Sequence, residues 1–244
     1  MRTNQFAVTA CFVLLLFTVV SAQNQNIGVI GGVNIANVDM DTDLEGIEPE
    51  NLTGFGLGGV LEFGLNENMS LCFEPMYLIK GFQQNMEEDL GMPFNVNIKG
   101  SNIEIPVFLK YFLGSGNMQP YVMVGPTIGI LMRADLGLNI MGIGFDLHVK
   151  DLLNSIDYGV GFGGGLRFAV GQNTFFVEGR YTLGLTNVAN KDKIQELVGA
   201  AQELANLLAG ELDTEDGIVI PDFDIEAKTK GIQIMAGFCM PLGG

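Results

Sequence analysis

Four acidic residues follow one another at a spacing that could bind a metal ion. The first, third, fifth and twelfth positions of one segment are acidic: Asp39, Asp41, Asp43 and Glu50. Such spacing is typical of a calcium-binding loop, because alternate carboxylates can wrap around one hard cation. The sixth position of that loop needs a glycine for its sharp turn, and here it is Leu44. The segment is therefore predicted to be a solvated acidic loop, with weak binding of a divalent cation as the alternative.

Hydrolysis is the other chemistry that the reactive side chains suggest. The chain has one histidine, His148, and the nearby residues that could serve a hydrolase are Asp146, Asp151 and Ser155. A nucleophile and its base must lie within hydrogen-bonding reach of each other, and short sequence separation alone does not ensure that. Because no fuller set of catalytic groups accompanies them, we predict no catalytic residue and no cofactor. A membrane-embedded hydrolase is kept as an alternative from another class.

The charge of the chain is unevenly distributed. Charged residues make up 16% of the sequence, yet the net charge is −16. A soluble domain usually carries about 25% charged residues. Few charges with a large acidic excess indicate that the acids are concentrated on a solvated face. The negative sign excludes the basic surface that nucleic-acid binding requires.

The first 22 residues have the pattern of a cleaved export signal. Arg2 precedes a short apolar stretch from Ala10 to Val20, and the small residues Ser21 and Ala22 follow it. A positive start, an apolar core and small residues at the end are what a signal peptidase recognises. The apolar stretch is shorter than the roughly 20 residues that a spanning helix needs. Residues 1–22 are therefore predicted to be removed, leaving residues 23–244 as one β-barrel domain.

A period of two dominates the rest of the sequence. Phe55, Leu57 and Leu61, for example, alternate with small or charged residues. Successive side chains of a strand point to opposite faces, so such segments are two-faced strands. Eight are predicted, at residues 27–37, 53–65, 69–82, 101–112, 119–133, 155–169, 174–187 and 228–241.

The connections between these strands alternate in length. Tight turns are expected at residues 66–68, 114–117 and 171–173, where turn-forming residues gather. Long connections are expected at residues 38–52, 83–100, 134–154 and 188–227. Short turns at one rim and long loops at the other are typical of bacterial outer-membrane barrels. The predicted fold is therefore an all-β, eight-stranded antiparallel up-and-down transmembrane β-barrel.

Charges of both signs recur on the less apolar face of the predicted strands. They are Glu62, Glu74, Lys80, Glu104, Lys110, Arg167, Glu178 and Arg180. Inside a narrow barrel such charges can pair, whereas on the lipid face each would cost several kcal/mol. A soluble ligand-binding barrel, the alternative, would place its apolar residues inside and its charges outside. We therefore predict a charge network in the barrel interior, lipid around the outside, and export to the outer membrane of a Gram-negative cell.

Tyrosines are expected at both edges of the membrane. Tyr111 and Tyr121 flank the second tight turn, and Tyr77 and Tyr158 lie towards the long connections. Amphipathic rings at both interfaces would form an aromatic belt.

Prolines fall within the predicted strands, where each removes a hydrogen-bond donor and local bulges are expected. Pro106 lies in Ile103-Glu104-Ile105-Pro106-Val107-Phe108-Leu109-Lys110-Tyr111-Phe112, and Pro120-Tyr121-Val122 and Gly125-Pro126 follow it. These motifs, together with residues 177–187 and 229–241, resemble the PorT-like outer-membrane β-barrel family of Bacteroidetes. The resemblance implies a barrel of about eight strands. Because the founding member is associated with the type IX secretion and gliding apparatus, it also implies secretion as an alternative function.

The last long connection is predicted to hold an amphipathic helix. Apolar residues recur at helical spacing: Ile194, Leu197, Val198, Ala201, Leu204, Leu207 and Leu208. Asn190 is a candidate N-cap and Gly210 a candidate stop. Either the helix packs over the barrel mouth, or Ile194, Leu197, Leu204 and Leu208 bind a partner protein.

Function is expected in the long connections. The interior of an eight-stranded barrel is filled by side chains, which argues against a diffusive channel, and loops commonly carry binding functions. The predicted function is that of a non-enzymatic outer-membrane protein with a structural or interaction role, displayed through acidic extracellular loops.

Overall fold

The computed structural model describes residues 25–42, 50–85, 94–140, 143–212 and 225–242, and the predicted export signal lies outside them. The elements are β1 (Gln25–Thr42), β2 (Glu50–Asn66), β3 (Met69–Phe73), β4 (Met76–Asn85), β5 (Phe94–Phe112), β6 (Met118–Ile140), β7 (Ile143–His148), the 3-10 helix η1 (Lys150–Leu152), β8 (Ile156–Val170), β9 (Asn173–Gly184), the helix α3 (Lys191–Leu212) and β10 (Ile225–Pro241).

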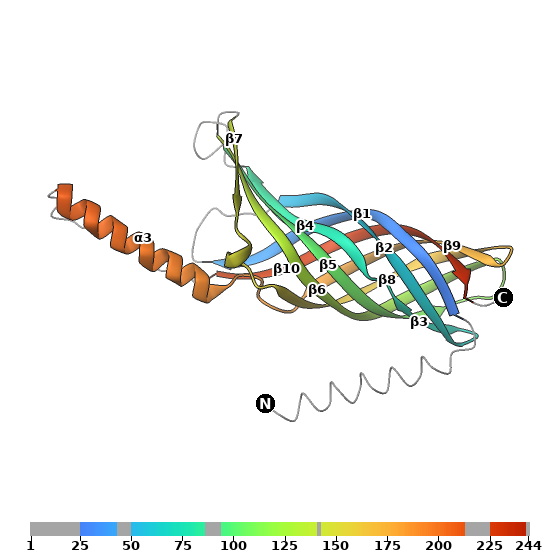
Figure 1. The fold of residues 1–244 in the computed structure, drawn as a ribbon. Coiled ribbons are helices and arrows are strands. Elements are labelled where there is room, and N and C mark those ends of the chain that lie inside the picture. Colours follow the sequence, from blue (N-terminus) through green and yellow to red (C-terminus); the bar gives the residue numbers. More distant parts are fainter. Residues whose placement is uncertain (1–24, 43–49, 86–93, 141–142, 213–224, 243–244) are drawn as a thin grey trace, which may run out of the picture.

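These strands close into a barrel (Figure 1). β1 pairs with β10 along its length, from Asn26 opposite Pro241 to Thr42 opposite Ile225, so the first and last strands join. β3 and β4 act as one strand, because their pairing with β2 and β5 keeps the same register on both sides of the break at Glu74. β7 pairs with β6 alone. The wall therefore has the eight antiparallel strands that the sequence predicts.

The connections have the predicted alternation of lengths. Tight turns join β2 to β3, β5 to β6 and β8 to β9. In the last of these, Gly171 has a φ of 66°, which glycine adopts without strain. At the other end the strands continue far into the predicted long connections: β6 has 23 residues and β5 has 19. A strand needs only about 9–11 residues to cross a bilayer, so this end of the barrel projects beyond the membrane.

The outer surface carries an apolar band. Large apolar side chains are exposed on β1, β2, β4, β5, β6, β8, β9 and β10, and Leu57, for example, is 64% exposed. The band has a clear edge towards the long connections. On β10 the outward face changes from Ile232 to Lys230, and on β6 it changes from Met132 to Arg133. Such a surface suits lipid, since charges begin where the strands leave the hydrocarbon.

The prolines are accommodated without the bulges expected for them. The register runs unbroken past Pro75, Pro106 and Pro120. Each of these prolines still accepts a hydrogen bond through its carbonyl oxygen, from the backbone N–H of Gly59 (3.0 Å), Glu74 (3.2 Å) and Leu113 (2.8 Å), respectively. The ladder loses a donor at each proline but keeps its alignment, and at Pro75 the loss separates β3 from β4.

Three of the tyrosines face outward and one does not. Tyr77, Tyr111 and Tyr158 are exposed, as a belt requires. The predicted place of Tyr121 in this belt is wrong, because its side chain is 3% exposed. On β6 the outward positions belong to Val122 and Val124, and strand alternation therefore turns Tyr121 into the interior.

The predicted helix is present at the long-connection end. Asn190 caps it, since its backbone oxygen accepts from the N–H of Ile194 (3.0 Å) and its side-chain oxygen from that of Lys193 (3.3 Å). Gly210 does not stop the helix, which continues to Leu212. Figure 1 shows α3 leading away from the barrel end. No helix within the described residues is both long enough and apolar enough to cross a bilayer.

Lipid-facing and rim positions should respond differently to a charge. We expect Leu57→Arg, in the middle of the band, to lower the free energy of unfolding by about 2–4 kcal/mol, and Thr53→Arg, at its edge on the same strand, by about 0–1 kcal/mol. Denaturant titration in phosphatidylcholine vesicles measures both. Equal losses at the two positions would contradict the placement of the band.

Candidate functional site

A closed ring of alternating charges crosses the middle of the bore. Lys110 on β5 contacts Glu74 (Nζ to Oε1, 2.9 Å) and Glu178 on β9 (Nζ to Oε2, 3.0 Å). Arg180, also on β9, contacts the other oxygen of each carboxylate, at 2.5 Å for Glu74 and 3.3 Å for Glu178. All four side chains are buried. The ring therefore ties two separate parts of the wall together through the interior.

Ion pairs lie on either side of the ring. Lys80 pairs with Glu104 towards the long-connection end. Arg167 pairs with Glu62 near the short-turn end (2.9 Å), where its guanidinium lies 5.0 Å from the centre of the Phe112 ring. The eight charged residues predicted for the interior thus all point inward, and each of the four acids contacts a base.

Glycines on β8 make room for the large inward side chains. A Cβ atom on Gly163 would lie 2.8 Å from the Cβ of Arg180, and one on Gly165 would lie 2.6 Å from the ring of Tyr121. Such distances are too short for any side chain, so β8 has to be smooth where it faces the ring. The run of glycines in the sequence is therefore explained by the bulk on neighbouring strands.

Two buried residues complete the ring and escape sequence reasoning. Tyr121 donates its hydroxyl to Glu178 Oε2 (2.6 Å). Gln233 on β10 accepts from Arg180 Nε (2.5 Å) and donates to Glu104 Oε1 (3.3 Å). A single amide between two isoleucines is the signal that could have placed Gln233 in the interior.

The arrangement of these groups suits packing and cross-linking of the wall rather than catalysis. Each of the carboxylates of Glu62, Glu74, Glu104 and Glu178 is held by a cation, so none of these four is left as a free base. Buried charges stay ionised only when they are paired with good geometry and further hydrogen bonds, and both conditions hold at the ring. The chemistry available here is therefore structural.

Of the four acids with calcium-loop spacing, the structure describes the side chains of Asp39 and Glu50. Asp39 belongs to β1, where its carboxylate pairs with Lys230 of β10, and Glu50 begins β2. Asp43 and the side chain of Asp41 lie outside the described residues. β1 extends into the segment predicted to be an acidic loop, because its pairing with β10 continues to residue 42. Within the described part of the chain no metal-binding group of three or more His, Cys, Asp or Glu side chains forms.

His148 is the last residue of β7 and lies opposite Asp135 of β6, at the end of their hairpin away from its turn, and its side chain is exposed. Its Nδ1 lies 3.4 Å from Asp135 Oδ1, and Arg133 contacts the same carboxylate at 2.5 Å. The hydrogen bond from Arg133 holds the pKa of Asp135 below its usual value. The carboxylate that the structure brings to His148 is thus on β6, and not one of its sequence neighbours Asp146 and Asp151.

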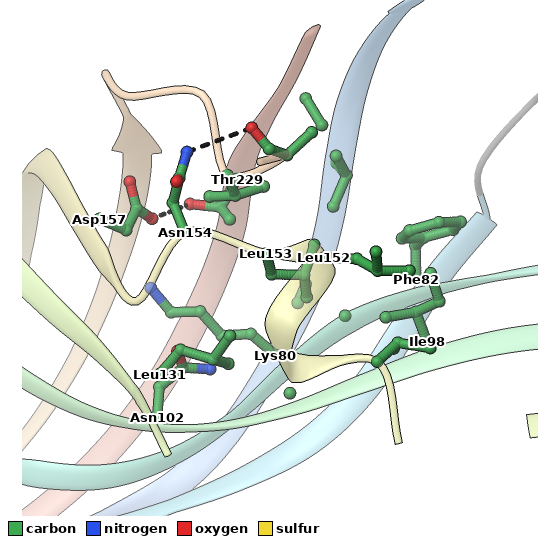
Figure 2. Close-up of a pocket in the computed structure, with 18 of the residues that line it drawn as sticks. Lys80, Phe82, Ile98, Asn102, Leu131, Leu152, Leu153, Asn154, Asp157 and Thr229 are labelled. Carbon is green, nitrogen blue, oxygen red and sulfur yellow. Dashed lines mark hydrogen bonds between the residues drawn. The ribbon is translucent and has the colours of Figure 1, made fainter. Parts of the chain in front are cut away.

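A cavity of about 350 Å³ occupies the mouth of the barrel above the Lys80–Glu104 pair. Its walls are largely apolar and include Val38, Phe82, Ile98, Leu131, Leu152 and Leu153. Figure 2 shows the apolar side chains Phe82 and Ile98 on one side of the view and Lys80, Asn102, Asp157 and Thr229 on the other. Sequence reasoning missed this cavity, because much of its wall comes from segments predicted to be loops.

Leu152, Leu153 and Asn154 form one wall of this cavity, which we call its roof, and hydrogen bonds hold it in place. The N–H of Asn154, just after η1, donates to Val188 O (2.8 Å), and its side-chain amide donates to Asn187 O (2.8 Å). The N–H of Asn190 donates in turn to Leu152 O (2.9 Å). The roof therefore joins η1 to the chain that leads into α3.

Comparison with known proteins agrees with this architecture. A family model described as "Outer membrane protein beta-barrel domain" matches residues 21–190. The outer membrane protein OprG from Pseudomonas aeruginosa is 9% identical over 91% of this chain and 98% of its own, with a TM-score of 0.50. Neisserial surface protein A (11% identity, 88% and 96% coverage, TM-score 0.41) and the outer membrane protease OmpT from Escherichia coli (10%, 91% and 98%, 0.43) are also similar. At these identities the likeness concerns the fold alone. No curated protein matches the chain.

Opening the ring should destabilise the barrel. Lys110→Met leaves Glu74 and Glu178 buried with one cation between them, and we expect it to lower the free energy of unfolding by about 3–5 kcal/mol. The double variant Lys110→Met/Glu178→Gln removes one charge of each sign and should lose less. Denaturant titration in vesicles measures both.

The exposed pair provides the matched control for this test. Arg133→Met removes a cation whose side chain is 57% exposed, and such pairs contribute little. If Lys110→Met unfolded at the same denaturant concentration as Arg133→Met and the unaltered protein, the ring would have no role in stability.

Proposed function

Because the chain belongs to the outer membrane protein β-barrel domain family, we propose that it is a non-enzymatic outer-membrane protein that acts by binding a partner at its long-connection end. Its place is the outer membrane, with lipid around the apolar band. Short turns face the periplasm in barrels of this kind and long connections face outward. The proposed working surface is therefore extracellular.

The filled bore supports a role in binding over one in conduction or catalysis. Buried ion pairs and the Tyr121 and Phe108 side chains occupy the middle of the barrel. A bore filled in this way leaves no continuous aqueous path. The four glutamates of the bore are held by cations. His148 lies with Asp135 on an exposed hairpin, away from these groups.

Helix α3 supplies the observation on which the proposed interaction rests. Ile194 packs against the apolar cluster of Val38, Phe82 and Ala227 at the mouth, so the start of the stripe is covered. One turn further, Leu197 is 56% exposed. The side chains of Leu204 and Leu208, which continue the stripe, lie outside the described residues. An exposed apolar stripe on a helix suits a groove on a partner protein.

Acidic residues add a second feature to this end. The connecting segments 43–49, 86–93 and 213–224 contain three, three and five acidic residues, respectively, and neither lysine nor arginine. A partner of the proposed kind would carry a basic rim around its apolar groove, because complementary charge speeds encounter and excludes wrong partners.

Site-specific photo-cross-linking in cells tests the proposed interaction. A photoreactive residue in place of Leu197 should give one discrete protein adduct. The same residue in place of Glu203, which is exposed on another face of α3, should give much less, and in place of the lipid-facing Leu57 none. The absence of an adduct at Leu197 at native expression levels would contradict the proposal.

Secretion is the alternative that the resemblance to the PorT-like family supports. The extracellular proteome of a strain lacking this gene, compared with its parent, distinguishes the two functions. A specific loss of secreted proteins, restored by the intact gene but not by one lacking residues 191–212, is the result expected of a secretion component. An unchanged secreted set would leave the interaction role alone.

A further inference from the structure

We propose that the cavity at the barrel mouth binds a small amphipathic molecule, a single alkyl chain that ends in a hydrogen-bond donor such as an alcohol or an ammonium group. This inference does not rest on the interaction proposed for α3, although Ile194 and Leu197 of α3 also border the cavity. It follows from the size of the cavity, its walls and the polar groups on its floor.

The walls favour an apolar chain. Val38, Phe82, Leu131 and Ala227 are buried and line the cavity, and Leu152 and Leu153 cover it from the roof. The volume of about 350 Å³ is at the small end of the range for ligand pockets, roughly 300–1,000 Å³. It suits one chain better than the two of a whole phospholipid.

The floor holds a hydrogen-bond acceptor without a partner. Asn34 is 1% exposed, and its side-chain N–H donates to Ile79 O at 2.8 Å. Its Oδ1 atom is buried and accepts no hydrogen bond. A buried acceptor left in this state is unfavourable, and a donor on a ligand would satisfy it.

The charges on the floor of the cavity determine which polar group a ligand can carry at its end. Asp157 accepts hydrogen bonds from Thr186 and Thr229, both at 2.7 Å. Two cations line the cavity, and each is engaged by a carboxylate: Lys80 by Glu104 and Lys230 by Asp39. Acceptors and negative charge are therefore in excess. A carboxylate would be repelled here, whereas a hydroxyl or an ammonium group would be bound.

The chain contains no tryptophan, so one introduced tryptophan reports on the cavity without background. Phe82→Trp places it in the cavity wall, and Phe55→Trp places a matched reporter on the lipid face. Both proteins are studied in phosphatidylcholine nanodiscs with decanol, decylamine and decanoate, each brominated at its far end, because bromine quenches indole fluorescence on contact.

We expect the alcohol and the amine to quench Phe82→Trp at a saturable site, and decanoate to quench it much more weakly. Phe55→Trp should respond to all three in proportion to their content in the bilayer. Quenching of Phe82→Trp that rises without saturation, as at Phe55→Trp, overturns the proposal, and so does saturable quenching by decanoate as strong as that by decanol.

Changes at Asn34 test the polar end. Asn34→Leu in the Phe82→Trp protein should weaken binding of the alcohol by about tenfold, the loss of roughly one hydrogen bond. Thr174→Val, an inward change at the opposite end of the bore, should leave binding as it is. Asn34→Asp keeps the size of the side chain and should favour the amine over the alcohol. Unchanged affinities for both ligands in the Asn34 variants that fold, as judged by gel mobility before and after boiling, would refute the assignment of the floor.

Discussion

The rest of the structure depends on one constraint: polar groups that cannot face lipid must satisfy one another inside the barrel. The backbone meets this constraint by closing β1 onto β10, which leaves no unpaired edge in the membrane. The side chains meet it through the ring of Glu74, Lys110, Glu178 and Arg180, with one ion pair on either side. Because each acid is held by a base, the interior can be charged and dry at the same time.

Bulk and glycine are distributed around the bore to match this network. Arg180 and Tyr121, which contact the carboxylates of the ring, come from β9 and β6. β8 lies between these two strands and carries glycine at the facing positions. A larger residue at Gly163 or Gly165 would push these side chains away from the carboxylates they contact. The position of the ring therefore depends on the glycines of β8 as well as on the charged side chains of the other strands. The same arrangement fills the middle of the bore, and the cavity lies at its mouth.

Much of this architecture is predictable from the sequence because a membrane barrel imposes strict alternation. The period of two is enough to find eight strands and to assign Glu62, Lys110 and Arg180 to the inward face. Where alternation alone does not decide, prediction is poorer. Tyr121 is equally plausible on either face until the register of β6 is known. Asp39 is predicted to lie in a loop because nothing local indicates that β10 continues the ladder beside it, with Lys228 opposite. The mouth cavity is lined by residues far apart in the chain, such as Phe82 and Leu153, and no local pattern marks it.

The paired charges of the bore and the excess acidic charge of the protein lie in different parts of the structure. The eight charges of the bore cancel, with four acids against four bases. The net charge of −16 is therefore carried by the rest of the chain. The low-dielectric interior within the membrane requires that its charges be paired. The charge of a solvated surface has no such requirement. The apolar cavity lies at the boundary between these zones, above the last ion pair of the bore and below the start of α3. At that level the strands still pair as a barrel but lie beyond the hydrocarbon, so an unfilled volume is tolerated there.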